Sequence, residues 1–274
     1  MKKTLAMFNI PNLFTATNML CGAIAILLSL TGRIDIAPFV IYLGAILDFF
    51  DGFLARLLKQ QGELGKQMDS LADMITFGLA PGMMMMVLIT YIIFPKSHEF
   101  LTQEFSLQVQ IALQDWLNKL SRLSSFSYTP FAALIIPFFS LFRLAKFNID
   151  TRQTDSFIGL NTPANTIFFS SIPLLCSVYL NKEGMSHNFL LNLLTIKSIL
   201  PLIIIMSLLL ISEIHFFSLK IKHFKWNGNQ LRFLFLITCL VLIFTLVVWS
   251  IPIIILLYIV LSLIENLIIK NKPL

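Results

Sequence analysis

The feature that most constrains the fold of this chain is a succession of apolar runs, each long enough to cross a membrane. They lie near residues 13–31, 36–58, 68–94, 127–147, 160–180, 193–218, 231–250 and 252–269. A helix of about 20 residues crosses a hydrocarbon core of about 30 Å. The runs therefore predict an all-α, polytopic integral membrane protein with about eight transmembrane helices, in which residues 1–274 form a single transmembrane domain. We place the turn between the last two helices at Ser250-Ile251-Pro252.

The composition supports the membrane class. The chain is 57% hydrophobic and 12% charged, and its mean hydropathy is +0.84. A soluble domain of this size does not need so much apolar surface. The net charge of +6 would suggest nucleic acid as the partner of a soluble protein, but in a membrane protein it is typical of basic loops that face anionic lipid. We therefore expect membrane lipid, and no nucleic acid, as a partner.

The distribution of basic residues predicts the orientation. If the eight helices alternate from a cytoplasmic N-terminus, fourteen of the 20 Lys and Arg residues fall on the cytoplasmic side. The other six fall outside, and they are Arg33, Lys96, Lys119, Arg122, Lys182 and Lys197. This asymmetry obeys the positive-inside rule. It predicts a multi-pass protein of the cell (inner) membrane with both termini at the cytoplasmic face.

The longest extramembrane segment, about residues 95–126, lies on the outer side in this topology. Its stretch Glu104–Leu113 alternates apolar and polar residues as a strand would. A helical stripe is formed instead by Val109, Leu113, Trp116, Leu117 and Leu120. We favour an amphipathic helix on the outer surface with a structural role.

Four aspartates in an apolar setting, Asp48, Asp51, Asp69 and Asp73, are the strongest indication of function. Each carboxylate inside a membrane costs roughly 2.5–3.5 kcal/mol on insertion scales. The single arginine between them, Arg56, cannot neutralise four acids. Either most of these carboxyl groups are protonated, or a cation is bound between them.

The spacing of the acidic residues predicts a helical hairpin over residues 48–73. One face of the first arm carries Asp48, Asp51, Gly52, Ala55 and Arg56. Asp69 and Asp73 share one face of the second arm, and Gly62 and Gly65 allow the turn between the arms. By the charge asymmetry, this turn is cytoplasmic.

Four converging carboxylates form an all-oxygen site suited to Mg²⁺ or Mn²⁺. Two such ions, about 3.5–4 Å apart, stabilise the attacking and leaving oxygens of a displacement at phosphorus. Arg56 is placed to hold phosphate oxygens. Two other interpretations remain open at this point: acids that only mark solvated helix ends, and a cation transporter with an acidic intramembrane pair.

The segment resembles the signature of the CDP-alcohol phosphatidyltransferases, D-x2-D-G-x2-A-R-x8-G-x3-D-x3-D. The matching positions are Asp48, Asp51, Gly52, Ala55, Arg56, Gly65, Asp69 and Asp73. The resemblance implies a membrane enzyme that transfers a phosphatidyl group from CDP-diacylglycerol to an alcohol and releases CMP. It also implies a homodimer and two divalent cations, Mg²⁺ or Mn²⁺, held by the four aspartates.

The same resemblance assigns roles to individual residues. Asp73 would be the general base that deprotonates the acceptor hydroxyl, and Gly52 and Arg56 would contact the CDP moiety. Asn12 and Thr15 either line the nucleotide site from the first helix or cap that helix.

Four further blocks resemble the phosphatidylserine synthases of this superfamily: Ile10–Thr15, Asp69–Asp73 with Phe77-Gly78, Phe142–Asp150 and Phe157–Ala164. Eight spans, with two extra C-terminal helices over 231–269, also suit this branch. The implied acceptor is L-serine, and the alternatives are a phosphatidylinositol-phosphate or phosphatidylglycerol-phosphate synthase. Two positions depart from the branch: Asn161 stands where Pro is usual, and Lys146 where Arg is frequent.

Serine carries a carboxylate, so its pocket needs a cation. Arg143 and Lys146 are the candidates, with Asn148 as a polar partner. The alternative is that both cations only anchor the cytoplasmic end of the helix.

Overall fold

The computed structural model describes residues 8–97, 100, 102–123, 125–150, 156–217 and 229–270. The first half of the chain forms α2 (Ile10–Leu30), α3 (Ala37–Leu57), α4 (Glu63–Asp73), the π-helix η1 (Met74–Leu79), α5 (Ala80–Ile93) and α7 (Phe105–Ser121). The second half forms the 3-10 helix η2 (Thr129–Leu134), α8 (Ile135–Ile149), β1 (Ser156–Ile158), α9 (Thr162–Tyr179), α10 (Met185–Leu193), α11 (Ile196–Ile211), β2 (His215–Phe217), α12 (Gln230–Leu246), η3 (Val247–Trp249) and α13 (Ser250–Lys270). The predicted all-α class is confirmed.

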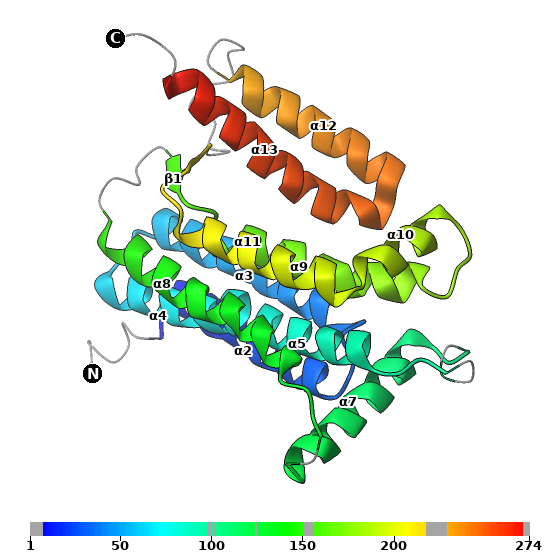
Figure 1. The fold of residues 1–274 in the computed structure, drawn as a ribbon. Helices are drawn as coiled ribbons and strands as arrows, with labels where there is room; N and C mark the ends of the chain where they lie inside the picture. The colour runs from blue at the N-terminus through cyan, green and yellow to red at the C-terminus, as the bar shows by residue number, and fades with distance from the viewer. Residues whose placement is uncertain are drawn as a thin grey trace.

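The long helices form one bundle with a separate pair beside it. Helices α2, α3, α5, α8, α9 and α11 run side by side, and α12 and α13 form an antiparallel pair along one side (Figure 1). Helix α7 lies beyond the end of the bundle that is far from α4 (Figure 1). The fold therefore separates the aspartate hairpin from the predicted outer helix.

Five helical segments within the described residues are long and apolar enough to cross a membrane, or up to six if the bent pair α10 and α11 is one span. The predicted count of eight is not confirmed. Helix α9 is not among the candidates, and it carries buried polar residues such as Asn165, Ser170 and Ser171. One of the five candidate segments, Gln230–Leu267, takes in all of α12 and most of α13. A multi-pass membrane protein follows from these segments.

Glycines allow α2 to lie directly against its neighbours. A Cβ at Gly22 would lie 2.5 Å from Thr76 Oγ1, and one at Gly44 would lie 2.9 Å from Thr76 Cγ2. The Thr76 hydroxyl donates a hydrogen bond to the Asn18 carbonyl at 2.9 Å. Helices α2, α3 and η1 therefore meet with almost no side chain between them, which brings the aspartate-bearing helices together.

We expect Gly22→Ala to lower the unfolding temperature of the protein in detergent, because the new Cβ would also lie 2.7 Å from Thr76 Cα. Overpacking of this kind costs about 1–3 kcal/mol. Gly62→Ala is the matched control, since a Cβ at Gly62 has nothing within 4 Å. Thermal unfolding followed by circular dichroism measures both variants. Equal unfolding temperatures would contradict the close contact between α2 and η1.

The helix that carries Asp69 and Asp73 continues without a break through η1 into α5. Pro81 follows the π-helix and has no N–H to donate to the Phe77 carbonyl one turn earlier. The Thr166 hydroxyl of α9 donates to that carbonyl at 2.7 Å. The π-helix thus begins directly after Asp73 and is held by a side chain from another helix. Short π-helical segments are frequent at functional sites.

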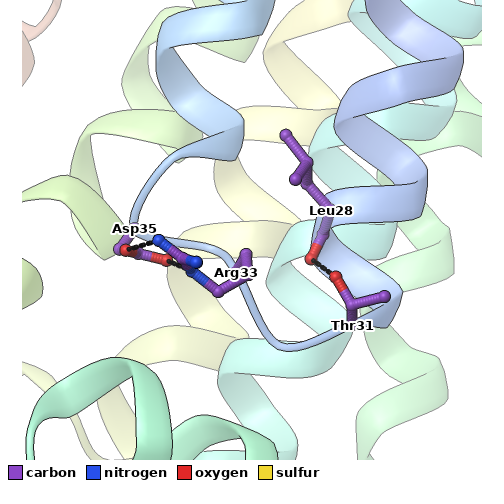
Figure 2. Close-up of polar contacts among 4 residues, drawn as sticks. All are labelled: Leu28, Thr31, Arg33 and Asp35. Atoms are coloured by element: carbon purple, nitrogen blue, oxygen red, sulfur yellow. Dashed lines mark hydrogen bonds and ion pairs between the residues drawn. The ribbon is translucent and has the colours of Figure 1, made fainter.

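The turn between α2 and α3 is fixed by polar contacts and by α7. Arg33 pairs with Asp35 through two hydrogen bonds of 3.0 and 3.1 Å, and the Thr31 hydroxyl donates to the Leu28 carbonyl (Figure 2). Gly32 has φ +79, a conformation that favours glycine, and a Cβ there would lie 2.6 Å from Gln110 Cγ of α7. Helix α7 therefore packs on this turn, at the end of the bundle opposite the aspartates.

The predicted helix within residues 95–126 is confirmed as α7. Val109, Leu113 and Trp116 are buried as the helical stripe requires, whereas Leu117 is exposed. The Tyr91 hydroxyl of α5 donates to Gln108 Oε1 at 3.1 Å. The buried face of α7 thus packs against another helix, α5, and does not only lie along the outside of the protein.

The C-terminal pair closes on a small antiparallel β-pairing between β1 and β2. The Tyr258 hydroxyl of α13 donates to the Phe217 carbonyl at the end of β2. The turn between α12 and α13 lies at η3, so its predicted place at Ser250-Ile251-Pro252 is wrong. Proline is tolerated in the first turn of a helix, and Pro252 lies inside the start of α13.

Candidate active site

Two helices carry the four aspartates, and a third holds them in place. Asp48 and Asp51 lie in the last turns of α3, and Asp69 and Asp73 lie on α4. Helix α2 packs against both. Gly65 lies inside the first turns of α4, where a Cβ would be 3.3 Å from Asn12 Oδ1. The interpretation of Gly65 as a turn residue is therefore wrong: it allows α4 to approach α2 closely.

Three of the carboxylates converge. Asp48, Asp51 and Asp69 each offer an oxygen, and these oxygens lie within 4.8 Å of one another. Asp51 is 5% exposed, and the other two are half-buried. Like charges at this separation repel strongly in a partly buried site, so the group needs a bound cation or protons.

The Thr15 hydroxyl orients one member of this group. It donates a hydrogen bond to Asp51 Oδ2 at 2.6 Å. Thr15 is buried on α2, one turn after the start of the helix. Partners of this kind fix the orientation of a metal-ligating carboxylate.

We expect Thr15→Val to raise the Mn²⁺ concentration needed for half-maximal activity by about 10-fold or more, the effect typical of losing such a partner. Valine keeps the shape of threonine and removes only the donor. Thr17→Val is the matched control, because the Thr17 hydroxyl donates to the Leu13 carbonyl of its own helix. An unchanged Mn²⁺ requirement in Thr15→Val would show that Asp51 does not need this donor.

Asp73 lies beside the group of three but is not a member of it. Its side chain interacts with Asp48 and Asp69. Its Oδ1 is buried and has no hydrogen-bond partner among the described residues. A buried acceptor without a donor, next to three carboxylates, fits a site that binds divalent cations. Asp73 as a metal ligand and general base stays a prediction.

A polar cavity of about 300 Å³ opens beside the aspartates. Its lining includes all four residues predicted for the CDP moiety, Asn12, Thr15, Gly52 and Arg56, together with Asp51 and Asp69. A Cβ at Gly52 would meet only Arg56 Nη1, at 3.6 Å. Gly52 therefore keeps this wall open toward an exposed guanidinium that can reach a phosphate.

The residues predicted for the acceptor do not line this cavity, and they do not form one cluster. Arg143 is 3% exposed, and its Nε donates to the Leu160 carbonyl at 3.1 Å. Arg143 Nη1 is buried without a hydrogen-bond partner among the described residues. Lys146 pairs with Glu213. The Asn148 amide donates to Ser70 Oγ at 2.8 Å, which brings only Asn148 against the aspartate-bearing helix.

Other residues at the site were missed by the sequence analysis. Lys66, Gln60 and Gln61 line the cavity, and Ser70 contacts Asn148. Lys66 and Ser70 could have been found, because Lys66 lies three residues before Asp69 and Ser70 three residues before Asp73 on one helix. Asn161 departs from the related branch for a local reason: its side chain accepts a hydrogen bond from Ala164 N at 2.9 Å and caps α9.

A second cavity, of about 410 Å³, lies between α9, α10, α11 and the start of α13. Its walls are almost wholly apolar and carry no charged side chain. It therefore offers no groups for phosphoryl transfer, and the chemistry of the described residues gathers at the aspartates.

The chain is similar to known proteins over most of its length. The family described as CDP-alcohol phosphatidyltransferase matches residues 8–264. A protein of Helicobacter pylori strain J99, named CDP-diacylglycerol–serine O-phosphatidyltransferase, is 30% identical over 219 residues, which cover 79% of this chain and 74% of the relative. A protein of the same name from Bacillus subtilis strain 168 is 33% identical over 56% of this chain and 69% of its own. An archaetidylserine synthase of Methanothermobacter thermautotrophicus is 27% identical over 63% of this chain and 61% of its own.

Proposed function

The chain belongs to the CDP-alcohol phosphatidyltransferase family, and from that premise we propose that it transfers the phosphatidyl group of CDP-diacylglycerol to L-serine. The products would be phosphatidylserine and CMP. The chain is a transferase of substituted phosphate groups and an enzyme of phospholipid biosynthesis. The convergence of Asp48, Asp51 and Asp69 beside a polar cavity carries the proposal. The names of the relatives from Helicobacter pylori and Bacillus subtilis support serine as the acceptor.

We propose that Asp48, Asp51, Asp69 and Asp73 hold two divalent cations, Mg²⁺ or Mn²⁺. Two observations support this assignment: the donor set is made of oxygens only, and Asp73 Oδ1 has no hydrogen-bond partner within the part of the chain that the structure describes. When bound, such ions neutralise the charge that develops on the phosphate oxygens.

The protein's own groups act on the proton and on the nucleotide. The Asp73 carboxylate takes the proton from the serine hydroxyl, because an alcohol is a poor nucleophile at neutral pH. The serine oxygen then bonds to the phosphorus that carries the diacylglycerol. The bond from that phosphorus to the bridging oxygen breaks, and the electron pair leaves with CMP. Asn12, Thr15, Gly52 and Arg56 form the walls against which the CDP moiety is held.

Arg56→Ala should raise the KM for CDP-diacylglycerol by roughly 10- to 100-fold, because a hydrogen bond to a charged group contributes about 1.5–3 kcal/mol. Arg56→Lys keeps the charge but not the two-pronged geometry, so its KM should lie between those of the parent and the alanine variant. Kinetics of CMP release and Mn²⁺ binding measure both effects. A collapse of Mn²⁺ binding in Arg56→Ala would make Arg56 structural and contradict its role at the phosphates.

For the acceptor, the buried Arg143 is the favoured partner of the serine carboxylate. Its Nη1, which has no hydrogen-bond partner among the described residues, supports this assignment, whereas Lys146 is engaged by Glu213. Asn148 would contribute through its position next to α4.

The excess of Lys and Arg on one side of the predicted topology supports a cytoplasmic active site and cytoplasmic termini in the cell (inner) membrane. Several of the residues in that count, including Lys2, Lys3 and Lys220, lie outside the described residues. We also propose a homodimer, on the resemblance to the family alone.

A panel of acceptors tests the proposed reaction. Purified protein receives CDP-diacylglycerol and Mn²⁺ with L-serine, inositol phosphate or glycerol phosphate, and CMP release is followed. We expect CMP only with serine. Release with inositol phosphate or glycerol phosphate, and none with serine, would reassign the acceptor. Cation flux into liposomes without any CMP release would favour a transporter and reject the transferase.

A further inference from the structure

One face of α4 is turned toward two other helices, α3 and α8. Four residues share this face of the helix because they follow one another at spacings of three, one and three: Lys66, Asp69, Ser70 and Asp73. Asp69 lies on this face among the carboxylates of α3. Lys66 and Ser70 lie on it against the last turn of α8.

Both of these contacts end on a single residue, Asn148. The Asn148 amide donates to Ser70 Oγ at 2.8 Å, and the Ser70 hydroxyl lies 3.1 Å from Asn148 Oδ1. The Lys66 ammonium donates to the Asn148 carbonyl at 2.8 Å. We call these three residues the Asn148 bridge. A cation on the carbonyl near the end of α8 is also favoured by the helix dipole.

The bridge joins the two halves of the site. Helix α8 carries Arg143 and Lys146 and reaches the bridge at Asn148, near its end. Helix α4 carries the other two members of the bridge, with Asp69 between them and Asp73 after both. The chain separation is 78 residues between Ser70 and Asn148, so local sequence does not impose the contact. A rotation of α4 about its axis would break both contacts and would move Asp69 away from Asp48 and Asp51.

We propose that the Asn148 bridge is a positioning device, in which Ser70 and Asn148 set the rotation of α4 so that Asp69 meets the carboxylates of α3. This inference rests on the proposed function. It makes Ser70 a positioning residue that does not touch the reacting atoms, leaves Lys66 in the wall of the polar cavity, and gives Asn148 a role other than direct contact with serine.

A double-mutant cycle with Ser70→Ala, Asn148→Ala and the double variant tests the bridge. The first readout is Mn²⁺ binding to the detergent-solubilised protein, measured by electron paramagnetic resonance of free Mn²⁺ without any substrate. We expect each single variant to weaken binding by roughly three- to tenfold, the value of one hydrogen bond. The double variant should be no weaker than the worse single one. Ser70→Thr keeps the hydroxyl and should bind Mn²⁺ as the parent does.

Two further measurements separate positioning from loss of folding and from the proposed reaction. Thermal unfolding should be similar for the parent and Ser70→Ala, and Thr17→Ala, whose hydroxyl bonds within its own helix, should change neither readout. Additive effects of the two substitutions, or parent-like Mn²⁺ binding in both single variants, would overturn the bridge. If the parent binds Mn²⁺ but releases no CMP with serine, the proposed function fails while the bridge is still judged from the binding data.

Discussion

Asp73→Asn should reduce CMP release by about 10²–10⁴-fold, the contribution that a positioned general base makes. Asparagine has nearly the same shape as aspartate but cannot accept the proton of the acceptor hydroxyl. Asp73 lies at the end of α4, directly before the π-helix, with its Oδ1 unpartnered among the described residues. Single-turnover measurement of CMP release, with both substrates saturating, isolates this loss from any change in binding.

The control for Asp73→Asn is Asp115→Asn. Asp115 lies on α7, at the other end of the bundle, where it pairs with Lys119 at 2.6 Å. Its replacement should leave CMP release unchanged. Since Asp73 is proposed to do more than hold a cation, added Mn²⁺ should not restore the activity of Asp73→Asn. Activity within a few-fold of the parent, or full recovery at high Mn²⁺, would remove Asp73 as the base.

Asp69→Asn should produce the second large effect, roughly a 10²–10³-fold loss of CMP release at moderate Mn²⁺. Cation stabilisation of phosphate charge contributes several kcal/mol, and each 1.36 kcal/mol is tenfold in rate. Asp69 belongs to the group of three converging carboxylates and also lines the polar cavity. Its amide would offer one neutral oxygen where the site now offers a charged one.

Recovery distinguishes this variant from Asp73→Asn. Raising Mn²⁺ should restore a measurable part of the activity of Asp69→Asn, because the loss lies in cation affinity. Mn²⁺ binding without substrate should weaken in parallel. A variant that binds Mn²⁺ as the parent does, yet loses activity, would place Asp69 outside the cation site.

The sequence predicts the site better than the number of spans. The spacing of Asp48, Asp51, Asp69 and Asp73 depends only on helical periodicity, and the structure brings three of them within 4.8 Å. Hydropathy is weaker evidence because it treats each helix alone. The polar residues of α9 are buried in the bundle, so that helix need not be apolar enough to face lipid on all sides.

Contacts between distant segments could not be predicted from the chain alone. Arg143, Lys146 and Asn148 are close in sequence, yet each has a different partner: the Leu160 carbonyl, Glu213 and Ser70. Their separation depends on the rotation of α8 against α4, α9 and α11. Gly65 is a similar case, because a side chain at this position would meet Asn12, which lies on another helix.

The central claim, cation-dependent phosphatidyl transfer to serine at the aspartate hairpin, is tested most directly by one titration. Protein stripped with EDTA is supplied with CDP-diacylglycerol and L-serine, and CMP and phosphatidylserine are measured as Mn²⁺ is added. We expect both products to be absent at first, to rise together in equal amounts with Mn²⁺, and to form about 10²–10⁴-fold more slowly in Asp73→Asn at every Mn²⁺ concentration. Product formation by the stripped protein without added Mn²⁺ or Mg²⁺, or CMP release without phosphatidylserine, would contradict the account.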